Sequence, residues 1–316
     1  MKRKLSVLLV IITVCGMTLT AQAEVGNEET SVYYSSLPET FSYDVSMEQI
    51  GADIDQYILK HDMGIERNTN AYTDLMHEFC FSDFPDLTDT TKRFYQAYAS
   101  VYLSNIIDIS ADISTYNVVA DQTIGEIREE NQEASNKIIE AAEQVQPNQV
   151  QPRFSSYDLG AAREYAKAYA DESNLQYIEY SKDCTNFASQ ILNAGGMKQN
   201  DRWKYSPLSG TGVGSPFRTW VNAHAFTEYW SLEKGYLGPA CTSLSQVKSS
   251  ADVGDFLSWM NHDTLEFYHI QFVQTKTADR EIYCSQHTPN YYNKKLSSKV
   301  SDSDFANQEV VVINFY

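Results

Sequence analysis

A short segment near the middle of the chain, residues 146–152, reads Gln-Pro-Asn-Gln-Val-Gln-Pro. Two prolines and no charged side chain are typical of a linker, because proline interrupts both helices and sheets. The charge balance changes across this segment: residues 24–150 carry 24 acidic and 6 basic side chains, whereas residues 151–316 carry 18 and 15. A chain of 316 residues is also long enough for two hydrophobic cores. The sequence therefore predicts two domains with a linker at 146–152.

The first residues have the order of an export signal. Basic residues 1–4 precede an apolar run at 5–19, and Ala21-Gln22-Ala23 supplies a cleavage site. The apolar run is shorter than the roughly 20 residues that cross a bilayer. A lipid-modified Cys15 is the alternative, but no small residue precedes it. We expect a signal peptide at 1–23 and a secreted chain without a membrane span, in a Gram-positive cell envelope.

Composition limits the partners of the exported chain. Residues 24–45 are polar and aperiodic, as in a flexible leader. The whole sequence has a formal net charge of −18, so nucleic acid and other polyanions are disfavoured as electrostatic partners.

Residues 46–145 show helical periodicity. Ser46 and Gln49 form a capping-box pattern, and apolar residues then recur at spacings of three and four. Asn131 lies within the last apolar seam, where a polar residue can fix register. We expect an acidic, all-α helical bundle that is a spacer, a cover for an active site, or a binding element for a protein partner.

The second half mixes helices and strands. Helices are expected over 157–171, from Asp183 to Gly195-Gly196, and from Ser215-Pro216 onward. Strand-like runs follow at 255–260, 268–275, 281–287 and 310–315. Helices followed by closely connected strands predict an α+β domain over 153–316, with helices packed on an antiparallel sheet.

Cys184 lies in the first turn of the helix that starts near Asp183. Unpaired amide groups and the helix dipole favour a thiolate there, and the same amides can stabilise an oxyanion. Asp183 is expected to cap this helix. The sequence thus predicts a cysteine nucleophile.

Four histidines of this half are candidates for the base that the thiol needs: His224, His262, His269 and His287. His269 lies within a predicted strand, where a rigid backbone can hold its imidazole against the helix start. His287 ends the next strand and could orient His269, as the third residue does in cysteine hydrolases.

The motifs of this half include Asp183-Cys184-Thr185-Asn186-Phe187, Ser189-Gln190, Gly195-Gly196, Trp203, Ser215 with Trp220, Gly254-Asp255-Phe256, Tyr268-His269 and Gln286-His287-Thr288. In these motifs and their order, residues 153–316 resemble the amidase domain of secreted Gram-positive proteins, a relative of NlpC-type papain-like cysteine peptidases. The resemblance implies a papain-like fold with Cys184 as nucleophile, His269 as base and His287 as the third residue.

Further residues can be assigned with alternatives. The resemblance places Tyr177 near the oxyanion hole, although Tyr180 is equally available because the usual Tyr-x-x-Gly-Gly context is missing. Trp220 is assigned to the substrate cleft, with burial in the core as its alternative. A disulfide between Cys241 and Cys284 is left open.

The expected activity is hydrolysis of an amide or peptide bond in peptidoglycan, or of another peptide substrate, through Cys184. No metal site or cofactor is expected, since His and Cys residues do not occur at metal-ligand spacings. The alternative is a catalytically idle envelope module whose helical half binds a protein.

Overall fold

The computed structural model of the chain describes residues 32–104, 120–145, 157–205 and 218–315. The predicted signal peptide, the predicted linker and the Ser215-Pro216 helix start lie outside these residues. Within the described ranges, no helix is long and apolar enough to cross a membrane.

The helices of the described residues are α1 (Met47–Lys60), α2 (Asn70–Phe81), α3 (Asp89–Ser104), α5 (Ile124–Glu143), α6 (Leu159–Tyr169), α7 (Cys184–Ala194), α8 (Arg218–Val221), α9 (Ala223–Glu228) and α10 (Leu244–Ser250). Short helical turns are η1 (Tyr229–Glu233), η2 (Leu296–Ser298) and η3 (Asp302–Ala306). The predicted capping box at the start of α1 is confirmed, because Ser46 and Gln49 bond to each other's backbone N–H groups.

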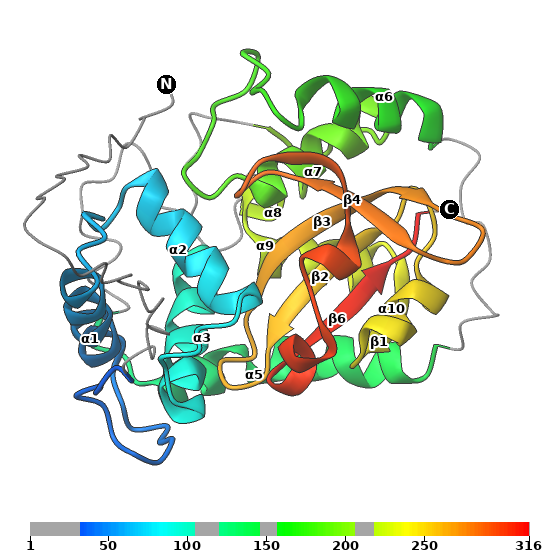
Figure 1. Cartoon of the computed structure of the whole chain (residues 1–316). Coiled ribbons are helices and arrows are strands. Elements are labelled where there is room, and N and C mark those ends of the chain that lie inside the picture. The colour runs from blue at the N-terminus through cyan, green and yellow to red at the C-terminus, as the bar shows by residue number, and fades with distance from the viewer. Residues whose placement is uncertain (1–31, 105–119, 146–156, 206–217, 316) are drawn as a thin grey trace, which may run out of the picture. The chain divides into compact units, whose positions relative to one another are not determined.

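One antiparallel sheet forms the centre of the fold (Figure 1). Its strands are β1 (Leu237–Cys241), β2 (Phe256–Asn261), β3 (Phe267–Lys276), β4 (Ile282–Gln286), β5 (Tyr291–Lys295) and β6 (Gln308–Ile313). Their order is β1-β6-β2-β3-β4-β5, and each neighbouring pair is antiparallel. The predicted α+β class with an antiparallel sheet is confirmed.

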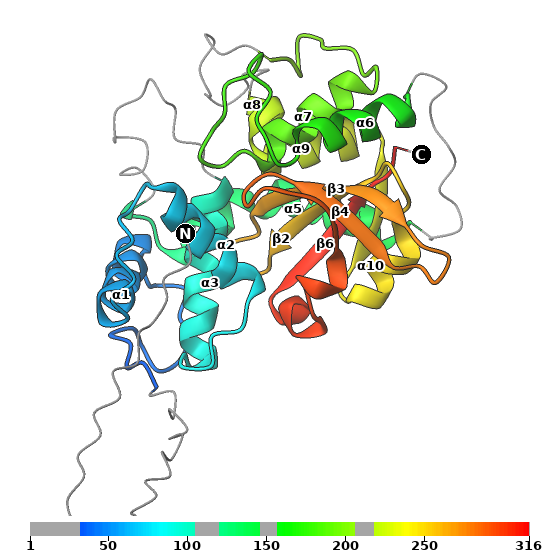
Figure 2. The same ribbon diagram turned by 45° about the horizontal axis from the view of Figure 1, so that its top comes forward.

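Side chains alternate between the two faces of the sheet, so each face has its own apolar cluster. Phe256, Ile270, Phe272 and Ile313 pack with helices α6 to α9. Figure 2 shows these helices together on one side of the sheet. This packing holds the start of α7 against β3.

The opposite face is covered by the N-terminal helices. Leu257, Trp259, Val310 and Val312 belong to one cluster with apolar residues of α1, α2 and α3. The N-terminal helices and the sheet thus share one apolar cluster, and the chain from residue 32 onward groups as one compact unit. Strands that are apolar on both faces require a cover on each, and the N-terminal helices supply the second one.

Helix α5 also departs from the predicted bundle. It packs against the sheet, where its Ile138 and Ala142 join Met260, Phe267 and Val311 in a third cluster. The Asn131 side chain donates a hydrogen bond of 3.1 Å to the carbonyl of Thr264, so it fixes α5 to the β2–β3 connection and not to another helix.

Candidate active site

Helix α7 places Cys184 at its first position. One face of the helix is apolar, and Phe187, Ala188 and Ile191 are buried in the cluster shared with the sheet. Asp183 stands at the N-cap but makes no side-chain capping bond. The predicted capping role of Asp183 is therefore wrong, because its carboxylate is used elsewhere.

The Asp183 carboxylate is the centre of a buried network. Its Oδ1 accepts hydrogen bonds from the Tyr180 backbone at 3.0 Å and from Asn186 Nδ2 at 2.8 Å. Its Oδ2 lies 2.6 Å from Nδ1 of His287. Only a few per cent of either side chain of this last pair is exposed. Asp183 thus ties the start of α7 to the end of β4.

The residues after β4 complete this connection. The Asp183 backbone N–H donates to Oγ1 of Thr288 at 2.9 Å. The His287 ring stacks on Phe187, with centroids 4.0 Å apart and planes 5° from parallel. Its Nε2 lies 2.8 Å from the carbonyl oxygen of Tyr169. The two sequence motifs around Cys184 and His287 are therefore in direct contact.

His269 lies on β3 and has a different partner. Its Nε2 is 2.9 Å from Oε1 of Gln286. An amide oxygen can only accept, so Nε2 carries the hydrogen and Nδ1 is left as the basic nitrogen. Within the described residues, Nδ1 makes no hydrogen bond. The imidazole is thus fixed in the tautomer that a general base requires.

Gln286 is itself held in place. Its Oε1 also accepts from Nε2 of Gln271 at 2.7 Å. The Gln271 amide bonds in turn to Tyr291 at 2.9 Å and accepts from Nε1 of Trp259 at 2.8 Å. This chain of buried hydrogen bonds gives Gln286 one orientation.

The predicted role of His287 as the residue that orients His269 is not met. His287 bonds to Asp183 and Tyr169. The oxygen that accepts a hydrogen bond from His269 belongs to Gln286, one residue before His287. Adjacent residues at a strand end point to opposite sides. A one-residue difference therefore moves the role from the histidine to the glutamine.

The thiol of Cys184 lies beside the same part of β3. The Ile270 backbone N–H hydrogen-bonds to it, and Oγ1 of Thr185 lies 3.6 Å from Sγ. Burial raises the pKa of the Cys184 thiol, and these two contacts oppose that change. Burial lowers the pKa of His269 to about 4, although the bond to Gln286 acts in the other direction. The structure thus brings Cys184 next to the strand of His269, and burial disfavours the charged form of both groups.

The other predicted site residues lie elsewhere. The Tyr177 hydroxyl accepts a 3.2 Å hydrogen bond from Asn193, at the opposite end of α7 from Cys184. Tyr180 lies at the Cys184 end. Trp220 is fully buried, and its Nε1 donates to Asn186 at 2.9 Å. Trp220 belongs to the apolar cluster of α6 to α9, which favours the core alternative over the substrate cleft.

The four described cysteines are all free thiols. Cys241 and Cys284 are buried, free thiols on β1 and β4. Three strands lie between them, which at about 4.8 Å for each step is far beyond disulfide reach. In the described part of the chain, no group of three or more His, Cys, Asp or Glu side chains could hold a metal ion.

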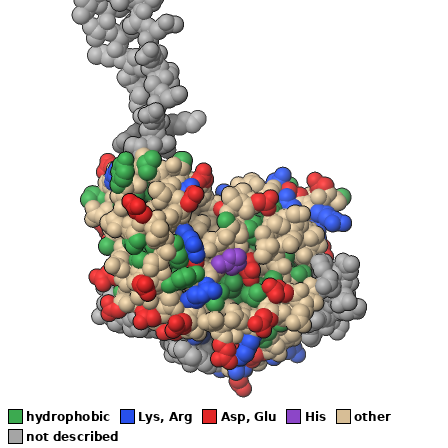
Figure 3. Space-filling model, turned by 90° about the horizontal axis from the view of Figure 1, so that it is seen from below, with side chains coloured by type: hydrophobic (Ala, Val, Ile, Leu, Met, Phe, Trp, Pro, Cys, Tyr) green, Lys and Arg blue, Asp and Glu red, His purple; other side chains and the backbone are tan. Residues whose placement is uncertain are grey.

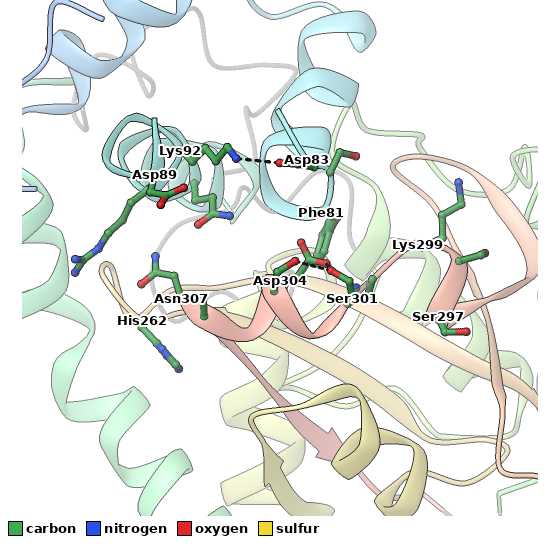
Figure 4. A pocket seen from close by; sticks show the side chains of 17 residues that line it. Phe81, Asp83, Asp89, Lys92, His262, Ser297, Lys299, Ser301, Asp304 and Asn307 are labelled. Carbon is green, nitrogen blue, oxygen red and sulfur yellow. Dashed lines mark hydrogen bonds and ion pairs between the residues drawn. The ribbon is translucent and has the colours of Figure 1, made fainter. Parts of the chain in front are cut away.

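A cavity of about 880 Å³ lies between the ends of α2 and α3 and the segment around η2 and η3 (Figure 4). Lys92 and Asp83 form an ion pair of 2.9 Å at its wall. Figure 3 shows one face of the molecule, over which acidic side chains are scattered. A histidine side chain lies in a hollow of this face, beside basic and hydrophobic side chains. The cavity lining contains Phe81, whose ring lies 5.9 Å from that of His269, but neither His269 nor Cys184 itself.

Comparison with known proteins bears on this site. Residues 156–310 match the model of a family described as "Putative amidase domain". This match agrees with the amidase part of the resemblance noted in the sequence, and it suggests hydrolysis of an amide bond for this region.

Two relatives come from Bacillus subtilis strain 168, and both are named as uncharacterized. YjcM is 33% identical over 147 residues, which cover 44% of this chain and 32% of YjcM. YhbB is 29% identical over 145 residues, which cover 44% of each. The chain therefore matches less than half the length of either relative, and no solved structure matches it significantly.

Proposed function

We propose that the protein is a cysteine amidase in which Cys184 is the nucleophile, His269 the general base and Gln286 the residue that orients the base. The observation that carries the proposal is the His269–Gln286 hydrogen bond of 2.9 Å, which leaves Nδ1 free to accept a proton. The next residue on β3, Ile270, contacts the thiol through its backbone N–H. The amidase description of residues 156–310 supports the same chemistry.

The reaction follows from these positions. Nδ1 of His269 takes the thiol proton, and the thiolate attacks the carbonyl carbon of the amide. The free N–H groups at the start of α7 stabilise the negative oxygen. The imidazolium then protonates the leaving amine, the C–N bond breaks, and a thioester remains on Cys184. Water, deprotonated by His269, hydrolyses this thioester and restores the thiol.

The substrate that we propose is an amide bond of peptidoglycan, cleaved outside the cytoplasm. The export-type order of residues 1–23 supports this location. The protein's strong negative charge disfavours docking on anionic wall polymers through charge alone. Recognition of a stem peptide or of its amide link to the sugar therefore fits better than recognition of the polymer backbone.

Mass spectrometry of muropeptides incubated with the full chain tests the proposal. We expect a new product that gains one water across an amide bond, and none with the Cys184→Ala variant. Peptides and side-chain amides of proteins serve as alternative substrates in parallel reactions. If no amide is cleaved even under conditions in which a thiol reagent labels Cys184 in folded protein, the idle binding module is the better description.

A further inference from the structure

The two proposed reacting groups are hidden from solvent. Cys184 is 6% exposed and His269 is 1% exposed. An amide substrate has to place its carbonyl carbon on Sγ and its nitrogen near the imidazole. Neither position is accessible in this arrangement, so the element that covers these groups decides when the site can work.

Helix α2 covers the imidazole. The ring of His77 lies edge-on against His269, with centroids 4.9 Å apart, and its Nε2 is 3.5 Å from Nε2 of Gln286. The ring of Phe81, one turn later, lies 5.9 Å from His269. Two side chains on one face of α2 therefore occupy the space beside the base, and Phe81 separates it from the cavity between α2 and η3.

The C-terminal end of α3 covers the other side of the site. The Nζ atom of Lys182, two residues before Cys184, lies 3.7 Å above the ring centroid of Tyr102. The carbonyl oxygen of Ser104 accepts a 2.6 Å hydrogen bond from Asn222. The α2–α3 segment (residues 70–104) thus contacts both the region of the thiol and the imidazole.

Resting on the proposed function, we infer that the α2–α3 segment is an inhibitory cover: it must move away from His269 before an amide can reach Cys184. The fold allows this movement because the segment has internal packing of its own. Phe79 of α2 packs on Tyr95 of α3, with centroids 4.8 Å apart, and on Tyr57 of α1 at 6.0 Å. The helices can therefore shift together with their mutual contacts intact, and the contacts that are lost are those of Phe81 with Trp259 and Tyr268 of the sheet.

Burial of the site also keeps the closed form chemically unreactive. The cover removes water from both groups, and the low dielectric disfavours the thiolate–imidazolium pair that starts the reaction. Withdrawal of α2 would hydrate the pair and open the path to the thiol in one step.

Alkylation of Cys184 by iodoacetamide in the folded full chain measures access to the thiol. The labelled peptide is quantified by mass spectrometry, so that Cys80, Cys241 and Cys284 are counted separately. We expect His77→Ala and Phe81→Ala to raise the labelling rate about tenfold or more, because labelling follows the fraction of open molecules. Urea unfolding of each variant establishes that it is folded during labelling.

Two matched variants serve as controls. Glu78→Ala changes an exposed residue of the same helix and should label at the unsubstituted rate. Phe79→Ala removes the same ring as Phe81→Ala but from a contact within the helical layer, so it should accelerate labelling less at equal stability. Folded His77→Ala and Phe81→Ala proteins that label no faster than Glu78→Ala would overturn the inference. If Phe81→Ala does not fold, His77→Ala decides the question.

Hydrogen exchange supplies a second measurement on the unsubstituted chain. A bulky maleimide on Cys184 cannot fit under the cover, so the α2 amides should lose protection in the adduct while β2 and β6 keep theirs. Unchanged protection of α2 would contradict the inference. Both measurements report the position of the α2–α3 segment whether or not muropeptides are cleaved. Fast labelling of Phe81→Ala without hydrolysis would therefore reject the proposed substrate and still support the inhibitory cover.

Discussion

Oε1 of Gln286 accepts a hydrogen bond from Nε2 of His269 at 2.9 Å. The partner of the imidazole is thus a neutral amide, which fixes the ring and its tautomer but does not stabilise a positive charge as a carboxylate would. The proposed base is positioned by geometry more than by electrostatics. This relationship leads to the first prediction.

Gln286→Ala should lower kcat/KM about 100-fold, because the imidazole loses its fixed orientation but keeps its basic nitrogen. Cys184→Ala and His269→Ala should remove measurable turnover. Rates on the cleaved muropeptide compare the three variants. Gln274→Ala on β3 is the control, since its amide bonds to Arg163 and not to the site. Full activity in Gln286→Ala would show that another group orients the base.

His287 should affect stability more than chemistry. His287→Ala leaves the Asp183 carboxylate buried without its ring partner, and we expect a loss of about 3–5 kcal/mol in the free energy of unfolding. Chemical denaturation measures this loss. The double variant Asp183→Asn with His287→Gln leaves no buried charge. Its loss in the free energy of unfolding should be smaller than the sum of the losses of its two single variants, and smaller than the loss in His287→Ala. A loss under about 1 kcal/mol for His287→Ala would show that the pair contributes little.

The pKa of His269 predicts a dependence of stability on pH. The folded-state pKa of about 4 lies below the ordinary value of 6.5, so between these values the unfolded chain binds a proton that the folded chain does not. Stability should therefore fall as the pH drops from 6.5 to 4, by at most about 1.4 kcal/mol for each pH unit.

The His269→Gln variant isolates this contribution in urea titrations across the same pH range. Asp255 acts in the opposite direction, since burial raises its pKa to about 7 and its contribution is lost as the pH rises from 3.8 to 7. The difference between the two proteins removes that background. Parallel curves for both proteins would mean that His269 titrates normally in the folded state.

Tyr177→Phe should change kcat/KM less than twofold, because the hydroxyl bonds to Asn193 at the far end of α7. The free energy of unfolding should fall by about 1 kcal/mol or less. Kinetics and denaturation on the same preparation check both values. A large loss of kcat with an unchanged KM would return Tyr177 to the oxyanion hole.

Much of the fold was predictable because local patterns agreed with tertiary packing. The four predicted strands correspond to β2, β3, β4 and β6. The edge strands were missed: β1 contains Gly238-Pro239, which is unfavourable in a sheet interior, and β5 is largely polar. The packing of the N-terminal helices on the sheet could not be predicted, because helical periodicity shows that a helix buries one face, and does not show whether a helix or a sheet covers it.

The site shows the same limit at the level of single residues. Cys184 and His269 could be chosen from helix-start and strand patterns. Gln286 could not be chosen, since glutamine is common on surfaces and the neighbouring His287 is the more obvious candidate for a role in catalysis. Strict alternation along β4 is the signal that separates them, because Gln286 and His269 share a face only in this register.

The contact between Asp183 and His287 joins residues that are 104 positions apart in the chain. Closing so long a loop is entropically costly, and folds that depend on contacts of this range form slowly. The start of α7 gains its anchor only after β4 is in place, near the C-terminal end of the sequence. An incomplete chain would therefore carry Cys184 without this anchor, and the hydrolysis proposed above would require that the chain as far as Thr288 has folded.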